Sequence, residues 1–316
     1  MRLTTRQNIR SKKALTSGFN MSINKAVIPV AGLGTRFLPT TLAVPKVMIP
    51  IYDRPSLHYC IEEAIDSGIT KIILIISEIQ EDIIKNYFSL NDSISDALKN
   101  KGHEKSLAEI EKILNRASVE FVIQKQPLGL GDAVLMAKKS IGETSFAVLL
   151  PDDLIIGNTP TLKHMLHIHS HTNDLVVAIK QVDSRDIPNL GIVSTANSQG
   201  EIHEIIGMVE KPSVEEAPSD LAIIGRYVLP IEIFDALERS HKGALGEIQL
   251  TDAIASLIPY RGCKGYLFQN AHFDVGTPLG LLQASLHQAV NRHGIDVDFG
   301  DWLNFSFPEN HQRLPK

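Results

Sequence analysis

The sequence has 316 residues, of which 43% are hydrophobic and 21% charged, and its formal net charge at pH 7 is −5. This composition is ordinary for a soluble globular protein and supplies ample apolar material for a core. The acidic balance gives no reason to expect a nucleic-acid or membrane-surface binder, and the chain has no apolar run long enough to predict a transmembrane helix. We therefore expect neither nucleic acid nor a membrane as a partner.

The first 24 residues are basic and contain no acidic side chain. They lack the apolar centre of a secretory signal, so we expect a disordered tail. A targeting peptide, or a start at Met21, would also fit this pattern. The two cysteines, Cys60 and Cys263, have neither metal-ligand nor redox spacing. Lone thiols are typical of a reducing cytosol, which predicts a cytoplasmic protein.

Short apolar runs alternate with amphipathic segments in the first half of the chain, as is typical of strand–helix–strand units. The runs that predict buried strands are residues 26–30, 71–76, 120–123 and 146–150. The segments that predict helices are residues 56–67 and 131–140, with a solvent-facing helix within 91–116. This alternation predicts a parallel sheet with helices on both faces.

After residue 157 the predicted strands are separated by polar loops. Three runs predict strands, at 175–178, 191–194 and 224–229, and a last amphipathic segment at 279–290 predicts a helix. We therefore expect one mixed α/β domain over residues 25–295, with a mainly parallel sheet flanked by helices. Residues 296–316 form the expected C-terminal tail.

A glycine turn, Ala31-Gly32-Leu33-Gly34-Thr35-Arg36, follows the first strand directly. Glycines let a backbone approach phosphates, whose oxygens the exposed amides can bind, and Arg36 would add a fixed positive charge. Phe37 stands where a dinucleotide fold would have a third glycine, and no Gly-Lys-Ser/Thr of a P-loop is present. The pattern favours a phosphate loop of a third kind, although a simple strand-to-helix turn would also fit.

The stretch from Lys25 to Pro55, with Gly-x-Gly-Thr-Arg-x-x-Pro followed by Pro45-Lys46, resembles the signature of the sugar-1-phosphate nucleotidyltransferases. This resemblance implies a Rossmann-like nucleotidyltransferase fold. It also implies that Lys46 contacts the nucleotide phosphates and that Ala31, Gly32 and Gly34 hold the nucleotide.

Further motifs, up to about residue 283, are most similar to the bacterial UTP–glucose-1-phosphate uridylyltransferases. The run Lys125-Gln126-Pro127-Leu128-Gly129-Leu130-Gly131 resembles their Gln followed by Gly-Leu-Gly. The resemblance implies that Gln126 reads the uracil edge, which an amide suits because it both donates and accepts hydrogen bonds. It also implies that Gly131 lets the base lie against the backbone.

Two aspartates are implied as metal ligands. Asp152 ends a buried strand, where open α/β sheets bind ligands, and Asp274 lies in His-Phe-Asp-Val-Gly. Mg²⁺ prefers oxygen ligands and takes one or two carboxylates with phosphate and water. Within Val209-Glu210-Lys211-Pro212, the resemblance implies that Glu210 binds sugar hydroxyls and Lys211 the sugar phosphate. Gly191 lies where the family keeps a glycine against the sugar.

The chain departs from the uridylyltransferase pattern at several places. A lysine is usual at Leu42, a glutamate at Val47, a histidine at Asp132, a tyrosine at Leu190 and a cysteine at Val275; Gln269 and Ala271 stand where a Lys-Gly-Lys run is frequent. Three functions remain open: a uridylyltransferase, a sister enzyme that uses dTTP or another sugar phosphate, and a binding paralogue.

The reaction that the resemblance implies is attack of a glucose 1-phosphate oxygen on the α-phosphorus of UTP. Pyrophosphate leaves, and UDP-glucose is the product. Arg36, Lys46 and Lys211 would offset the repulsion between two polyanions, together with Mg²⁺. The expected partners are therefore UTP and glucose 1-phosphate, and we expect a homo-oligomer.

Overall fold

The computed structural model of the protein describes residues 23–89, 96, 98–101, 104–240 and 246–293. The expected tails at residues 1–24 and 296–316 lie outside this part, apart from residues 23 and 24. Within the described residues, nine strands form one large sheet in the order β5-β4-β1-β6-β11-β8-β12-β10-β9. Their bounds are β1 Lys25–Pro29, β4 Lys71–Ile76, β5 Ser118–Ile123, β6 Phe146–Leu149, β8 Leu175–Gln181, β9 Gly191–Gln199, β10 Ile202–Glu210, β11 Leu221–Leu229 and β12 Cys263–Leu267.

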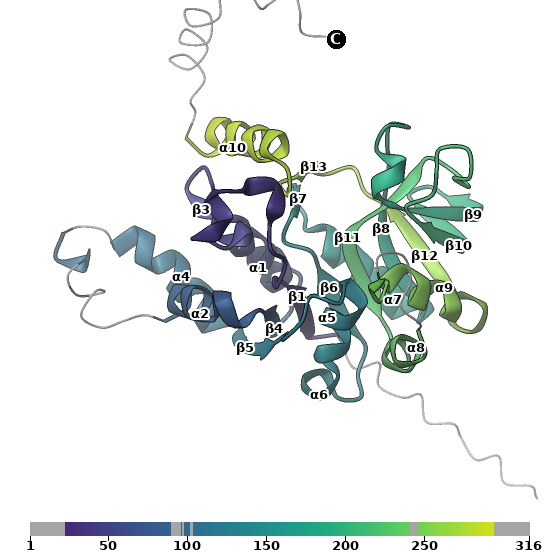
Figure 1. Ribbon diagram of the computed structural model, residues 1–316, viewed down its shortest axis with the longest axis horizontal. Coiled ribbons are helices and arrows are strands. Elements are labelled where there is room, and N and C mark those ends of the chain that lie inside the picture. Colours follow the sequence, from purple (N-terminus) through teal and green to yellow (C-terminus); the bar gives the residue numbers. More distant parts are fainter. Residues whose placement is uncertain (1–22, 90–95, 97, 102–103, 241–245, 294–316) are drawn as a thin grey trace, which may run out of the picture.

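The two halves of the sheet differ in strand direction. β5, β4, β1 and β6 are parallel neighbours. β11 runs antiparallel to both β6 and β8, while β8 is parallel to β12, and β10 is antiparallel to β12 and β9. The predicted mixed α/β fold is confirmed, with its parallel part concentrated at the end of the sheet formed by the first half of the chain (Figure 1).

Helices cover both faces of the sheet. Because successive strand side chains point to opposite faces, Ile28 and Ile72 pack on one face, and Val27 and Ile73 on the other. The first face is covered by α1 Ser56–Asp66, α4 Glu104–Arg116 and α7 Thr161–Thr172, with α2 Glu81–Tyr87 beside them. The second is covered by α5 Leu130–Met136, α8 Ile233–Arg239 and α9 Leu250–Arg261, and α6 Lys138–Ile141 follows α5. The helix expected at 131–140 is thus two helices that meet at Ala137.

A smaller core joins two short strand pairs to the last helix. The pairs are β2 Pro50–Ile51 with β3 Arg54–Pro55, and β7 Asp153–Ile156 with β13 Ala271–Asp274. Ile51, Leu154, Val275 and Ala284 form the buried centre of this core. The helix predicted at 279–290 is confirmed as α10, Pro278–His293, which lies beside β3 and so returns to the first part of the chain (Figure 1).

Candidate active site

The carboxyl ends of the parallel strands meet at one edge of the sheet. The glycine turn follows β1, Gln124 follows β5, and the segment from Leu150 to Asp152 follows β6. β8 points the same way as β6, because both are antiparallel to β11, and it ends at Lys180 and Gln181. Open α/β sheets bind ligands at this edge, so the order of the strands gathers these polar segments in one place.

A cavity of about 510 Å³ lies over the glycine turn, and we call it the glycine-turn cavity. Its walls come from the turn, from the loop before α5 and from the end of β6. The lining residues include Ala31, Gly32, Gly34, Lys46, Gln124, Gly129 and Asp152. The predicted phosphate loop therefore faces a cavity large enough for a small ligand.

Gly34 has the left-handed backbone that glycine tolerates, with φ of 65°. A Cβ there would lie 2.8 Å from Lys46 Cβ and 3.0 Å from Thr41 Cγ2. The Thr41 hydroxyl donates a hydrogen bond to the Gly34 carbonyl at 2.9 Å. Glycine at this position thus lets the turn pack directly on the segment that carries Lys46.

Replacing Gly34 with alanine is expected to lower the free energy of unfolding by about 2 kcal/mol, because φ is positive and the new methyl group collides with Lys46. Urea denaturation measures this change. Gly32→Ala is the matched control, since nothing lies within 4 Å of a Cβ there. An equal loss of stability in both variants would contradict the assignment of strain to Gly34.

Lys46, which lines the glycine-turn cavity, forms an ion pair with Asp152 at the end of β6. The Lys46 ammonium donates to Asp152 Oδ2 at 2.7 Å. Burial opposes ionisation of Asp152, but the Lys46 charge and hydrogen bond hold the pKa of this carboxyl below its ordinary value. Asp152 is therefore a carboxylate at neutral pH.

Asp152 and Asp274, which are far apart in the sequence, are brought together by the β7–β13 pair. Asp153 is opposite Asp274 in that ladder, and the Val275 amide donates to the Asp152 carbonyl at 2.8 Å. A Cβ on Gly276 would lie 2.8 Å from Asp274 Oδ1 and 3.3 Å from Asp152 Oδ2. Both carboxylates thus border one point next to Gly276.

The two aspartates form a donor set that suits a hard divalent cation. Burial raises the pKa of Asp274, and the nearby carboxylates of Asp153 and Asp152 raise it further. An oxygen-binding cation at this point would relieve that repulsion. The residues present therefore fit a divalent cation such as Mg²⁺, the ion that the family resemblance implies.

A second cavity of about 590 Å³ lies on the other side of Asp152, and we call it the acidic cavity. It shares Leu150 and Asp152 with the glycine-turn cavity. Its lining includes Arg36, Asp153, Lys180, Asp183, Asp186, Leu190, His272 and Asp274. Asp152 therefore lies where two ligand-sized cavities meet, and Asp274 lines the acidic cavity.

Gly191, Glu210 and Lys211 form a group next to the acidic cavity but do not line it. Gly191 is opposite Glu210 in the β9–β10 ladder, and Thr251 donates to Glu210 Oε2 at 2.7 Å. Lys211 has a left-handed φ of 49°, and its amide donates at 3.0 Å to the carbonyl of Leu190, which does line the cavity. The structure thus places this predicted sugar-binding group at the rim.

Two of the predicted nucleotide-binding residues lie outside the glycine-turn cavity. Gln126 is exposed, whereas Gln124 is only 6% exposed and lines the cavity. The reason is position, since Gln124 is the first residue after β5 and Gln126 lies two residues further along the loop. Gly131 is buried and its amide donates to the Ile248 carbonyl at 2.8 Å, while Gly129 lines the cavity instead. The amide and the glycine that line this cavity are thus Gln124 and Gly129, and not the expected Gln126 and Gly131.

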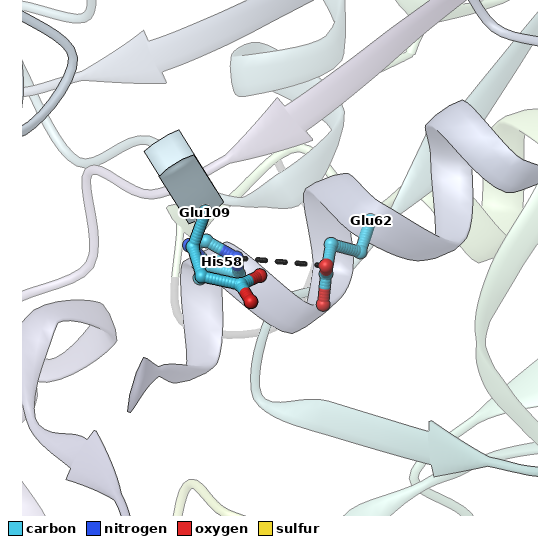
Figure 2. Close-up of side chains that lie close together, drawn as sticks. All are labelled: His58, Glu62 and Glu109. Carbon is cyan, nitrogen blue, oxygen red and sulfur yellow. Dashed lines mark ion pairs between the residues drawn. The ribbon is translucent and has the colours of Figure 1, made fainter. Parts of the chain in front are cut away.

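A separate cluster, formed by His58, Glu62 and Glu109, also has the composition of a metal site (Figure 2). Its centre is taken by the Arg54 guanidinium, whose Nη1 lies 3.0 Å from Glu62, 3.1 Å from Glu109 and 3.4 Å from His58. His58 Nδ1 is also 2.8 Å from the Tyr87 hydroxyl. Lys112 adds a second cation 3.4 Å from Glu62, so two protein cations face the two glutamates in a structural ion-pair network.

We compared the sequence with models of known protein families. Residues 25–290 match the family model described as Nucleotidyl transferase. The chain therefore belongs to the nucleotidyl transferase family.

No helix within the described part of the chain has the length and apolar character needed to cross a membrane.

Within that family, the chain is similar to UTP–glucose-1-phosphate uridylyltransferases. One from Bacillus subtilis (strain 168) is 42% identical over 270 residues, which make up 85% of this chain and 91% of that relative. The solved structure of a UTP-bound UGPase from Acinetobacter baumannii is 41% identical, with a TM-score of 0.81, covering 89% of this chain and 98% of that one. A UDP-glucose pyrophosphorylase complexed with UDP-glucose is 34% identical, with a TM-score of 0.78, covering 85% of this chain and 100% of that one.

Proposed function

We propose that this chain transfers a uridylyl group from UTP to glucose 1-phosphate, giving UDP-glucose and pyrophosphate. The observation that carries the proposal is the meeting of two cavities at the Asp152–Asp274 pair. A transferase must hold two substrates on either side of the transferred group, and this geometry supplies a place for each. The relatives named above support the choice of UTP and glucose 1-phosphate over other pairs.

The glycine-turn cavity is the proposed nucleotide site. The turn at Ala31, Gly32 and Gly34 offers backbone amides to phosphate oxygens. The Gln124 amide, whose Nε2 donates to Asp132 Oδ2 at 2.7 Å, would face the uracil edge. Gly129 lets the cavity wall pack closely on the segment of Glu247 and Ile248, since a Cβ there would lie 2.8 Å from Glu247 Cβ. Lys46 reaches the boundary between the cavities and would there contact the phosphates.

The chemistry requires alignment and charge neutralisation more than proton transfer, because the attacking phosphate oxygen is already an anion. Arg36 lines the acidic cavity and Lys46 the glycine-turn cavity, so positive charge flanks the transferred group on both sides. Asp152 and Asp274 would hold Mg²⁺, which supplies neutralisation of the phosphate charge when it is bound. Lys211 and Glu210 at the rim would bind the sugar phosphate and hydroxyls.

Lys180 is a further cation in the acidic cavity, which sequence patterns did not single out. It lies at the end of β8 and is half-buried, and burial lowers the pKa of its ammonium. Within the described residues it has no ion-pair partner, so its charge is available to an anionic ligand. The acceptor phosphate is an anion of the required kind.

We expect Lys180→Met to raise KM for glucose 1-phosphate by about tenfold while KM for UTP changes little, because an unshared charge contact to phosphate is worth about 1.5 kcal/mol. Initial-rate measurements with each substrate varied in turn would show the split. Lys163→Met on the exposed side of α7 serves as the charge control. Equal changes in both KM values would contradict the placement of Lys180 on the acceptor side.

The test of the proposed function is pyrophosphate release by the purified protein with Mg²⁺ and glucose 1-phosphate, with UTP and dTTP compared. Release with UTP at a kcat/KM at least about tenfold above that with dTTP is expected. A preference for dTTP would assign the chain to a sister activity. Binding of UDP-glucose without release from any nucleotide would assign it to a binding role.

A further inference from the structure

Arg226, in the middle of β11, has a fully buried side chain, which is rare for arginine. Its guanidinium has five N–H groups, and the structure gives each of them an acceptor. Nε and Nη2 donate to Glu63 Oε2 at 3.0 and 2.8 Å. Nη1 donates to the carbonyls of Leu150 and Gly225 at 2.9 and 3.0 Å, and Nη2 donates to the Asp153 carbonyl at 2.8 Å.

Two of these acceptors lie on either side of a proposed metal ligand. Leu150 and Asp153 flank Pro151 and Asp152, the turn between β6 and β7. Arg226 therefore holds both ends of the turn that presents Asp152. Glu63 belongs to α1, and its other oxygen accepts a hydrogen bond from the Leu162 amide of α7 at 3.2 Å. The turn is thus tied through the guanidinium to two helices of the core.

The same contacts extend to the second aspartate. Asp153 is opposite Asp274 in the β7–β13 ladder, and its Oδ1 lies 2.8 Å from His272 Nε2. A Cβ at Gly225, the neighbour of Arg226, would lie 2.3 Å from Asp153 Oδ2, so glycine is required for this approach. Fixing the backbone of Asp153 therefore fixes the strand that places Asp274.

A buried ion pair is an expensive way to stabilise a fold. Removing two charges from water costs about as much as their attraction returns, and an apolar pair of similar volume is often as stable. What an apolar pair lacks is directional donors for the carbonyls of Leu150 and Asp153. The feature specific to Arg226 and Glu63 is therefore the geometry that they impose on the turn.

We propose that Arg226, oriented by Glu63, is a positioning residue that sets the spacing of the Asp152 and Asp274 carboxylates and thereby the affinity of this pair for a divalent cation. This inference rests on the proposed function for its link to the reaction. Neither residue lines either cavity, so both act through the turn that they hold.

The decisive variant is the double replacement Glu63→Leu with Arg226→Met, which removes both charges and keeps the volume. We expect the variant to stay folded with a lower urea unfolding midpoint, because the carbonyls of Leu150, Gly225 and Asp153 and the Leu162 amide each lose a hydrogen-bond partner. We expect the dissociation constant for Mn²⁺, titrated into the protein without nucleotide and followed by water-proton relaxation, to rise at least about tenfold, as is found when partners that orient metal ligands are lost. The Mg²⁺ concentration for half-maximal activity should rise in parallel.

The matched control is Arg54→Met with Glu62→Leu, which removes another arginine–glutamate pair, between β3 and α1, whose atoms are 3.0 Å apart (its Glu62 is drawn in Figure 2). That pair has no contact with the turn, so Mn²⁺ affinity should not change.

Arg226→Lys is a second test that keeps the charge opposite Glu63. Its compact ammonium has three donors and no planar fork, so it should loosen Mn²⁺ binding as well.

The inference would be overturned if the double variant or Arg226→Lys were folded and bound Mn²⁺ as tightly as the wild type. It would also be overturned if the wild-type chain showed no measurable affinity for Mn²⁺. The titration contains no nucleotide and no sugar phosphate. A wild-type chain that binds Mn²⁺ but transfers no uridylyl group would therefore overturn the proposed function and leave the positioning role intact.

Discussion

Asp152→Asn is expected to lower kcat by about 10³-fold, the largest loss for any single replacement proposed for this chain. The asparagine keeps the volume of the side chain but removes the negative charge that faces both Lys46 and Asp274. The proposed metal site would then have one carboxylate, and the Lys46 ammonium would lose its partner. Steady-state rates of pyrophosphate release at saturating substrates and Mg²⁺ measure the effect.

Asp66→Asn is the control for this experiment, since Asp66 is an exposed carboxylate at the end of α1 that contacts Arg116 at 2.7 Å. Its replacement should change kcat by less than about twofold, as is usual for surface ion pairs. If Asp152→Asn retained a tenth or more of the wild-type kcat, Asp152 would not be a ligand of the catalytic cation.

Lys46→Met should reduce kcat/KM for UTP by about 10²–10³-fold. Lys46 is the cation at the boundary between the two cavities, and a methionine fills its volume without charge. Its loss also removes the ammonium that holds the pKa of Asp152 below its ordinary value. The variant should therefore lose affinity for UTP, as titration calorimetry with UTP would show directly.

Lys46→Arg distinguishes charge from position in this experiment. This variant restores the positive charge, but its guanidinium group is larger than the ammonium group of lysine. The backbone of Gly34 packs closely against Lys46 Cβ, so a larger side chain has little space there. We expect partial recovery of kcat/KM. Full activity in Lys46→Met would remove the lysine from the proposed mechanism.

The sequence predicted those parts of the fold that depend on local pattern. The apolar runs at 71–76 and 146–150 correspond to β4 and β6, because a strand buried on both faces must be apolar throughout. The glycine turn lies directly after β1, as the sequence predicted, and it lines a cavity. The helix at 131–140 was predicted at the right place, but its division into two helices at Ala137 was not predicted.

The remaining features depend on contacts between distant segments, which local patterns cannot show. The choice between Gln124 and Gln126 depends on where β5 ends, and strand ends are set by pairing with β4. β7 and β13 are four residues each and were not predicted, although their pairing is what places Asp274 beside Asp152. Nothing in the local sequence around Arg226 indicated that its side chain is buried.

The small core around Ile51, Leu154, Val275 and Ala284 has a consequence for the order in which the protein is completed during synthesis. The glycine turn, Lys46 and Asp152 all leave the ribosome within the first half of the chain. Asp274 becomes part of the site only after β13 pairs with β7 and α10 packs beside β2. The glycine-turn cavity, which is lined by residues up to Glu247, can therefore be complete in a nascent chain before Asp274 lies beside Asp152.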